Sequence, residues 1–331
     1  MVPLNTAPKR DLDITCLACD TSREMSDSKP HIRIITGKGG VGKTVVATAL
    51  ALSEARRGKR VLLAEVNAHD RVAALLGAHP VGSTMREVLE NLHVVDMNAT
   101  DGIREYALLT IRFEAIYKAV FENRIARHFI RFIPSLGEMV MLGKLWYHDN
   151  ETIDSKRRFD SIIVDAPATG HAISMLRTPA AIEKVVPKGP MRDHARAIRE
   201  MLVDSSRTCM HVVTLPEEMP VNEARELEAA STNKLGIALG TTFINQSINP
   251  LPTDGVSSFA QSGTASLERA AETLSVREGK RRAGEEHLSR LPAHMMDHSI
   301  RLPRIVGRGL GKSQVCALAD IIDEQLGGAS P

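Results

Sequence analysis

A glycine-rich run near the start of the chain joins a β-type segment to a helical one. Residues 32–36 are rich in β-branched side chains, residues 37–44 read GKGGVGKT, and residues 44–57 have a helical composition. Glycine permits backbone angles and close approaches that other residues resist, so four glycines in eight residues indicate a loop whose backbone N–H groups can turn inward. The sequence therefore predicts a strand, an anion-cradling loop and a helix in direct succession.

The loop also carries the side chains that a phosphate-binding loop requires. Lys43 can reach the β- and γ-phosphates of a nucleotide, and the Thr44 hydroxyl can coordinate Mg²⁺. The following helix offers its N-terminus to the anion. We therefore expect ATP and Mg²⁺ as ligands, the alternative being a glycine turn that binds no nucleotide. The expected ATP contacts within the loop are Gly37, Lys38, Gly39, Gly40, Val41, Gly42, Lys43 and Thr44.

The rest of the chain alternates between apolar strand segments and helical segments. This alternation predicts an α/β fold, a doubly wound and mostly parallel sheet with helices on both faces. We expect a disordered leader over residues 1–29 and one nucleotide-binding domain over 30–331. Helical insertions are expected at about 99–155 and 249–292, where the alternation is interrupted.

Composition excludes several other classes of protein. The net charge is +2 and no apolar run reaches the length of a membrane span, so neither nucleic-acid binding nor a transmembrane segment is indicated. Four cysteines in 331 residues do not form a disulfide framework, which favours a cytoplasmic protein. Cys16 and Cys19 form a single CxxC pair in the leader, without a second pair to complete a four-thiolate zinc site.

A second candidate site segment follows the apolar strand at residues 159–164. Asp165 ends this strand, and a carboxylate there can hold Mg²⁺ through water because a hard cation prefers oxygen ligands. Thr44 and Asp165 are therefore the expected metal-binding residues. The segment continues as DAPATGH over residues 165–171, where Thr169 and His171 are placed to sense a γ-phosphate and Gly170 gives a turn freedom to move.

Two features of these motifs mark a family resemblance. Lys38, directly after the first glycine, gives the deviant Walker A form of the SIMIBI class of P-loop NTPases. In this feature the chain resembles the dimeric ATPases that include ParA, MinD, the nitrogenase iron protein and ArsA-type pumps. DAPATGH is similar to the DTAPTGH segment of the ArsA family, which also contains the ATPases that target tail-anchored membrane proteins. The resemblance covers about residues 31–325.

The resemblance implies roles for three further positions. Lys38 would act catalytically in trans, on the nucleotide of a partner subunit, which implies a homodimer. Asn245 follows a strand where the family places an asparagine that reads adenine. Asn67 occupies the place of an aspartate that orients the attacking water, and an amide cannot accept the proton of that water. We therefore expect hydrolysis to be slow, unless Glu65 or Asp70 compensates.

Three functions remain open at this point. The first is a Mg²⁺-dependent dimeric ATPase of the ArsA type that acts as a switch and carries an apolar client. The second is a positioning ATPase like ParA or MinD, although no basic face or amphipathic membrane helix is evident. The third, motivated by Asn67, is a nucleotide-gated scaffold that binds ATP but barely cleaves it.

The client prediction rests on residues 101–150. Eight of the 11 aromatic residues lie there, together with Met139 and Met141, and methionine suits a surface that adapts to different partners. We expect this stretch to offer a membrane-helix-like client an apolar surface; the alternative is that its aromatics pack against the ATPase core. The aromatic residues are Tyr106, Phe113, Tyr117, Phe121, Phe129, Phe132, Trp146 and Tyr147.

Overall fold

An eight-stranded sheet forms the centre of the protein. The computed structural model describes residues 30–67, 70–98, 136–250, 265–305 and 309–327. The strand order is β10-β9-β8-β1-β7-β2-β4-β3, and every neighbouring pair is parallel except β3 with β4. This confirms the predicted α/β fold with a mostly parallel sheet. The strands are β1 (Ile32–Gly37), β2 (Val61–Val66), β3 (Arg86–Leu89), β4 (Leu92–Met97), β7 (Ser161–Ala168), β8 (Thr208–Thr214), β9 (Ala238–Ser247) and β10 (Ser299–Pro303).

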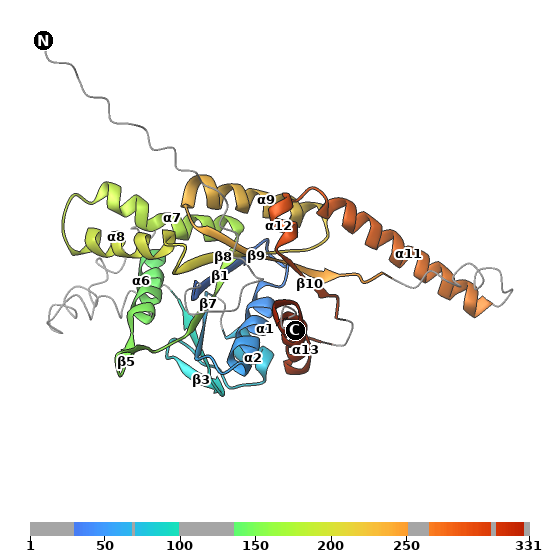
Figure 1. The fold of residues 1–331 in the computed structure, drawn as a ribbon, viewed down its shortest axis with the longest axis horizontal. Helices are drawn as coiled ribbons and strands as arrows, with labels where there is room; N and C mark the ends of the chain where they lie inside the picture. The colour runs from blue at the N-terminus through green and yellow to red at the C-terminus, as the bar shows by residue number, and fades with distance from the viewer. Residues whose placement is uncertain (1–29, 68–69, 99–135, 251–264, 306–308, 328–331) are drawn as a thin grey trace, which may run out of the picture.

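Helices cover both faces of the sheet, as Figure 1 shows. One face carries α1 (Lys43–Arg56), α2 (Arg71–Leu76) and α13 (Lys312–Gly327). The opposite face carries α6 (Leu136–Asn150), α7 (Thr169–Val185), α8 (Pro190–Val203) and α9 (Glu218–Ala230). The central strands are buried on both faces, so every residue of β2 and β8 is buried instead of every second one.

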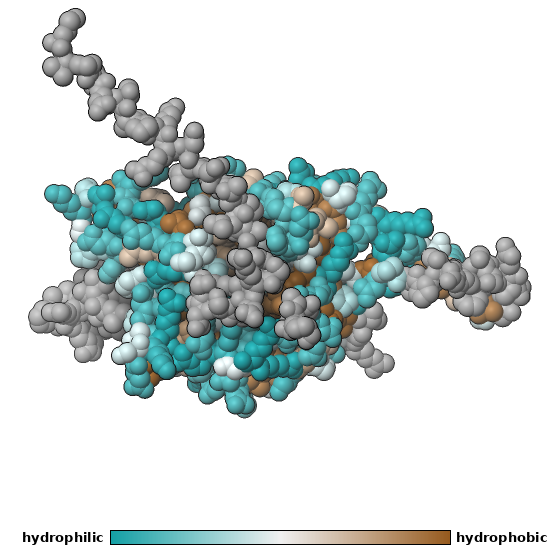
Figure 2. Space-filling view, in the orientation of Figure 1, coloured by the Kyte–Doolittle hydropathy of each residue, from teal (hydrophilic) through white to brown (hydrophobic). Residues whose placement is uncertain are grey.

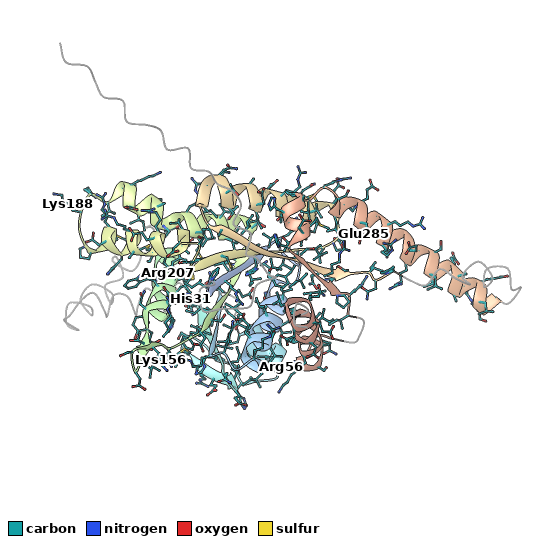
Figure 3. All side chains as sticks on the ribbon, viewed as in Figure 1. His31, Arg56, Lys156, Lys188, Arg207 and Glu285 are labelled. Carbon is teal, nitrogen blue, oxygen red and sulfur yellow. The ribbon has the colours of Figure 1, made fainter. Side chains whose placement is uncertain are left out.

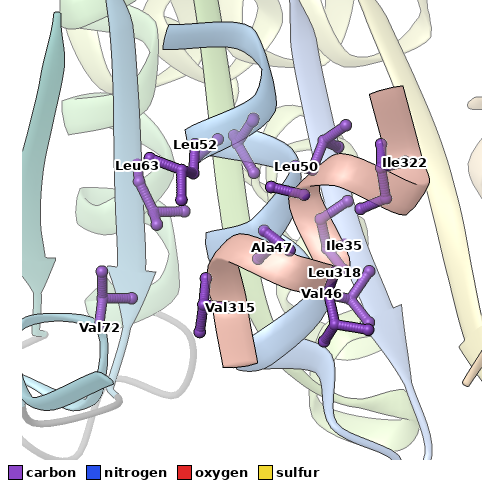
Figure 4. Packing of buried hydrophobic residues seen from close by; sticks show 14 of the residues in the cluster. Ile35, Val46, Ala47, Leu50, Leu52, Leu63, Val72, Val315, Leu318 and Ile322 are labelled. Carbon is purple, nitrogen blue, oxygen red and sulfur yellow. The ribbon is translucent and has the colours of Figure 1, made fainter. Parts of the chain in front are cut away.

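The core beneath α1 and α13 holds the first helix against the sheet. Leu50 of α1, Leu318 and Ile322 of α13 and Ile35 of β1 are each at most 2% exposed, and Figure 4 shows them interdigitating. Because α1 begins at Lys43, this packing also fixes the position of the loop that precedes it.

The structure corrects two sequence-based expectations about local structure and adds one strand that was not predicted. β7 does not end at Asp165 but runs on to Ala168. Residues 169–171 form the first turn of α7 rather than a free turn, so Gly170 lies in a helix and the freedom expected of it is wrong. The antiparallel edge strand β3 was not predicted, because its burial is low and its four residues give little periodicity.

A charged network ties α6 to the end of the sheet away from the glycine loop. Asp149 near the end of α6 accepts hydrogen bonds from His31, just before β1, and from Arg207, just before β8. Arg157 donates to the Nδ1 atom of His31 over 3.0 Å, so Nε2 carries the proton that His31 donates to Asp149. Figure 3 shows His31 and Arg207 close together there. The network anchors the helix that follows residues 99–135.

Only the last part of the expected client-binding stretch lies within the described residues. Residues 101–135, with six of the eight aromatics, lie outside them, as do residues 1–29 with Cys16 and Cys19. Within α6, Met139 and Met141 are 7% and 5% exposed and pack in the core with α7 and α8. The expectation that these two methionines form an adaptable surface is therefore wrong.

The second expected insertion contributes a long helix that projects from the body of the protein. α11 (Ala265–Leu288) is followed by the short helix α12 (Ala293–Asp297), and Figure 1 shows α11 extending beyond the sheet. Its projecting part is mostly hydrophilic in Figure 2. Within the described ranges, every helix is too short or too polar to cross a bilayer.

The packing of α13 on α1 gives a stability prediction. Leu318→Ala should lower the free energy of unfolding by about 2–5 kcal/mol, because it removes a buried side chain and leaves a cavity beneath α1. Glu324→Ala on the exposed side of the same helix should change it by less than about 0.5 kcal/mol. Urea denaturation followed by circular dichroism measures both, and equal losses in the two variants would contradict the core assigned here.

Candidate functional site

The candidate site lies at the carboxyl ends of the central strands. β1 stands between β7 and β8, whereas the next strand in the chain, β2, lies on the far side of β7. The chain therefore reverses its direction of travel across the sheet beside β1, and such a switch point leaves a crevice where ligands bind in open α/β sheets. The glycine loop at residues 37–44 starts from this point.

Two glycines let the loop approach its neighbours closely. A Cβ atom on Gly37 would overlap the carbonyl oxygen of Val213 in β8, and one on Gly42 would overlap the Asn245 amide. Gly42 also has a φ of 92°, in the left-handed region that L side chains rarely adopt. These contacts explain why glycine is needed at both positions, at the start of the loop and before α1.

Asn245 lies against the loop from β9. Its side-chain Nδ2 donates a 2.8 Å hydrogen bond to the carbonyl oxygen of Val41, and its Oδ1 accepts one from the backbone of Gln246. The side chain is buried, so it pins the middle of the glycine loop to the sheet. Its role in reading adenine stays a prediction.

Lys43, Thr44 and Asp165 meet at the head of the loop. Lys43 Nζ donates to the carbonyl oxygen of Lys38 over 3.2 Å, and Thr44 Oγ1 donates to Asp165 Oδ2 over 2.6 Å. Burial lowers the pKa of Lys43, and the nearby Asp165 offsets part of this change. The lysine thus lies within a partly desolvated site beside a carboxylate.

The donor set at Asp165 fits Mg²⁺. Its Oδ1 atom is buried and has no hydrogen-bond partner among the described residues. A hydroxyl and one carboxylate are oxygen ligands of the kind that Mg²⁺ takes, with water and phosphate oxygens completing the shell. No group of three or more His, Cys, Asp or Glu side chains within the described ranges is placed to hold a metal ion by itself.

Glu65 adds a second buried carboxylate beside Asp165. The two residues face each other in register on β2 and β7, and Glu65 Oε1 accepts a 3.0 Å hydrogen bond from the backbone of Val72. Burial raises the pKa of Glu65 to about 7, and the neighbouring Asp165 adds to the rise. Burial likewise raises the pKa of Asp165 to about 6, against the hydrogen bond from Thr44. Neither carboxylate has a fully compensating cation, so both charges are costly.

Two residues after β2, Asn67 and Asp70, were candidates for orienting the attacking water. Asn67 has a φ of 54° and an exposed side chain, and its backbone N–H bonds to Met97. Asp70 is committed elsewhere, because its Oδ1 accepts hydrogen bonds from Val81 and Gly82. Glu65 is therefore the carboxylate of this segment that lies next to Asp165, and the role expected of Asn67 stays a prediction.

Lys38 is held by a residue that the sequence reasoning did not single out. Its ammonium pairs with Glu223 Oε1 from α9, and Glu223 Oε2 accepts a 3.1 Å hydrogen bond from Thr169 in the switch segment, residues 165–171. Glu217 and Glu218, at the start of the same helix, are more exposed than Glu223. No local pattern in the sequence marks Glu223, because it joins the site only through the packing of α9.

Arg71 is a further cation that the sequence reasoning missed. It lines a pocket of about 430 Å³ together with Gly40, Lys43 and Thr44. Although burial has the larger effect on each, the positive charge of Arg71 lowers the pKa of both Lys43 and Asp165. The pocket is therefore lined by two cations beside the backbone of the loop, which suits a polyanion.

Comparison with known proteins agrees with this geometry. The family model of the anion-transporting ATPases, ArsA ATPase, matches residues 31–191, which include the glycine loop and the switch segment. Over this stretch, which is just under half of the chain, the protein is similar to the ArsA ATPase family. Two curated relatives carry arsenical pump-driving names. The putative arsenical pump-driving ATPase 2 of Aquifex aeolicus is 25% identical over 66% of this chain and 80% of its own length. The arsenical pump-driving ATPase of Escherichia coli is 27% identical over 72% of this chain and 38% of its own.

A third curated relative comes from another organism. The ATPase BagA of Mycobacterium tuberculosis is 28% identical over 230 residues, which cover 66% of this chain. The match spans 65% of the length of that relative.

The buried carboxylate of Glu65 gives a pH prediction. Its folded-state pKa, about 7, lies above the ordinary 4.5, so the folded protein binds more protons between these values and loses stability as the pH rises through them. Without nucleotide and Mg²⁺, Glu65→Gln should raise the free energy of unfolding at pH 8 by about 2 kcal/mol and leave it unchanged near pH 4. Glutamine still accepts the bond from Val72.

Denaturation at a series of pH values measures this effect. The exposed Glu90 serves as the control, and Glu90→Gln should leave the pH dependence as in the parent. A Glu65→Gln variant that is less stable than the parent at pH 8 would show that the charged form of Glu65 stabilises the fold.

Proposed function

We propose that this chain is a Mg²⁺-dependent ATPase that works as a nucleotide-controlled switch. The observation that carries the proposal is the hydrogen bond between Thr44 and Asp165, made directly beside Lys43. Thr44 and Asp165 lie 121 residues apart along the chain and meet at the end of the glycine loop, where α1 begins. Their chemistry is that of a site that holds phosphate oxygens and a magnesium ion together.

Different residues of the site would bind the phosphates and the metal ion. The backbone N–H groups of residues 39–44 and the ammonium of Lys43 bind and orient the phosphates, and Thr44 and Asp165 hold the metal. Bound Mg²⁺ neutralises charge on the phosphate oxygens. Arg71, at the rim of the same pocket, adds a second cation near the phosphate chain. Catalysis of this kind depends on positioning and on charge stabilisation.

A homodimer and slow hydrolysis belong to the same proposal. Lys38 is expected to act on the phosphate of a partner subunit, and a two-fold arrangement is the economical way to give each subunit the same contact. Asn67 cannot accept a proton from the attacking water. Glu65 carries a carboxylate next to Asp165, and its raised pKa, about 7, suits a group that accepts a proton near neutral pH.

The client of the switch remains a prediction. The resemblance to ATPases that target tail-anchored proteins places an apolar client at residues 101–150. Tyr147 of α6 is 54% exposed and is the described aromatic residue that such a surface would use. A positioning ATPase like ParA or MinD and a scaffold with little hydrolysis remain the alternatives.

ATP affinity should depend on Lys43. Lys43→Ala should weaken ATP binding at least about tenfold, about 1.4 kcal/mol, because the ammonium is the charge nearest to the loop backbone. Lys188→Ala removes an exposed lysine between α7 and α8, labelled in Figure 3, and should leave the affinity unchanged. Isothermal titration calorimetry with ATP measures both. Equal affinities in the parent and in Lys43→Ala would reject the assignment of the loop.

Magnesium dependence should require Asp165. Asp165→Asn keeps an acceptor for Thr44 but removes the charge that attracts the metal, so Mg²⁺-dependent turnover should fall about tenfold or more. ATP affinity in EDTA should stay within about twofold of the parent. Asp154→Asn, in the exposed turn between β5 (Thr152–Ile153) and β6 (Lys156–Arg157), is the matched control. Full Mg²⁺-dependent turnover in Asp165→Asn would remove this residue from the metal site.

A further inference from the structure

Glu223 joins the glycine loop to the switch segment within one chain. One carboxylate oxygen pairs with Lys38 of the loop and the other accepts a 3.1 Å hydrogen bond from Thr169, the first residue of α7. Three elements, the loop, α7 and α9, therefore meet at a single carboxylate. Neither the phosphate-binding role of the loop nor the metal-binding role of Asp165 accounts for Glu223.

The pair lies where its charges act strongly. The side chains of Lys38 and Glu223 are 30% and 25% exposed, so solvent screens them less than it screens a surface pair. Glu223 is also close enough to raise the pKa of Lys43, although burial of that lysine has the larger, opposite effect. A carboxylate thus lies among the cations that the phosphate site needs.

A phosphate oxygen and Glu223 would compete for the same ammonium. Lys38 can act on a nucleotide only if it turns away from Glu223, or if Glu223 tolerates a second anion close by. Two anions at such a distance repel each other in a partly buried site. If Lys38 turned away, Glu223 would keep its hydrogen bond with Thr169. The break in the ion pair would therefore affect the contacts at the start of α7.

We propose that Glu223 is a positioning residue that holds Lys38 and Thr169 together in the nucleotide-free chain and yields Lys38 to a γ-phosphate oxygen. This inference rests on the proposed ATP binding and deepens it. Glu223 makes the release of Lys38 specific to ATP, because only a nucleotide with a γ-phosphate brings an anion that displaces the carboxylate from Lys38. The same competition lowers the affinity for ATP and leaves the affinity for ADP nearly unchanged. The γ-phosphate belongs either to the nucleotide of the same chain or to that of a partner copy.

The test compares affinities for the slowly hydrolysed analogue ATPγS and for ADP, each with Mg²⁺, by calorimetry on the full chain. Glu223→Gln removes the competing charge and keeps the shape, so affinity for ATPγS should rise about tenfold and affinity for ADP by less than about twofold. Glu226→Gln removes an exposed acid from the same helix and should change neither affinity. Glu223→Ala must shift the ratio in the same direction as Glu223→Gln.

A double-mutant cycle ties the effect to Lys38. In a Lys38→Ala background, Glu223→Gln should no longer alter the ratio of the two affinities, because the residue that the anions compete for is gone. Repeating the titrations at protein concentrations where ultracentrifugation finds monomers and where it finds dimers identifies the source of the γ-phosphate. A gain at both concentrations assigns it to the same chain, and a gain with dimers alone assigns it to the partner copy.

The remaining outcomes overturn the inference. Equal gains for ATPγS and ADP, a loss of ATPγS affinity in Glu223→Gln, or an undiminished effect in the Lys38→Ala background would each show that Glu223 does not compete with a γ-phosphate for Lys38. If the parent binds ATPγS normally and Glu223→Gln behaves as Glu226→Gln does, this inference alone fails. If the parent binds neither nucleotide, the proposed function fails with it.

Discussion

The close approach of the glycine loop to two neighbouring strands is the constraint on which the site depends. The backbone of Gly37 packs against β8, and the backbone of Gly42 packs against the side chain of Asn245 in β9. Asn245 then holds the loop through the carbonyl of Val41. Because no side chain fits at either contact, the loop has one position relative to the sheet. Lys43 and Thr44 at the start of α1 are positioned by the loop, and a ligand bound to them would be positioned in the same way.

Around this fixed loop, charges are buried without full compensation. Asp165 and Glu65 lie side by side on neighbouring strands, and burial raises the pKa of both. The cations Lys43 and Arg71 line the phosphate pocket, while Lys38 is paired with Glu223. The site thus places acids where a metal would bind and cations where a phosphate would bind. A nucleotide with its metal supplies charges of both signs and relieves both imbalances at once.

The sequence predicted the parts whose chemistry is local. The α/β fold follows from alternating segments. The meeting of Thr44 with Asp165 was predicted because the glycine loop and the acid after an apolar strand each offer Mg²⁺ an oxygen ligand. Glu223 and Arg71 were missed because no local pattern marks them; they join the site only through the packing of α9 and α2. Met139 and Met141 were misplaced because residue type alone does not tell a core methionine from a surface one.

The strand order also has a consequence for synthesis of the protein. β1 and β2 are consecutive in the chain but are not neighbours, because β7 inserts between them. When β1 and β2 have emerged from the ribosome, the edges that pair with β7 stay unpaired until residues 161–168 emerge as well. Such edges are the surfaces through which incomplete chains pair wrongly or aggregate. About a hundred residues must be synthesised between β2 and β7, so these strand edges stay exposed for longer than they would if β1 and β2 paired directly.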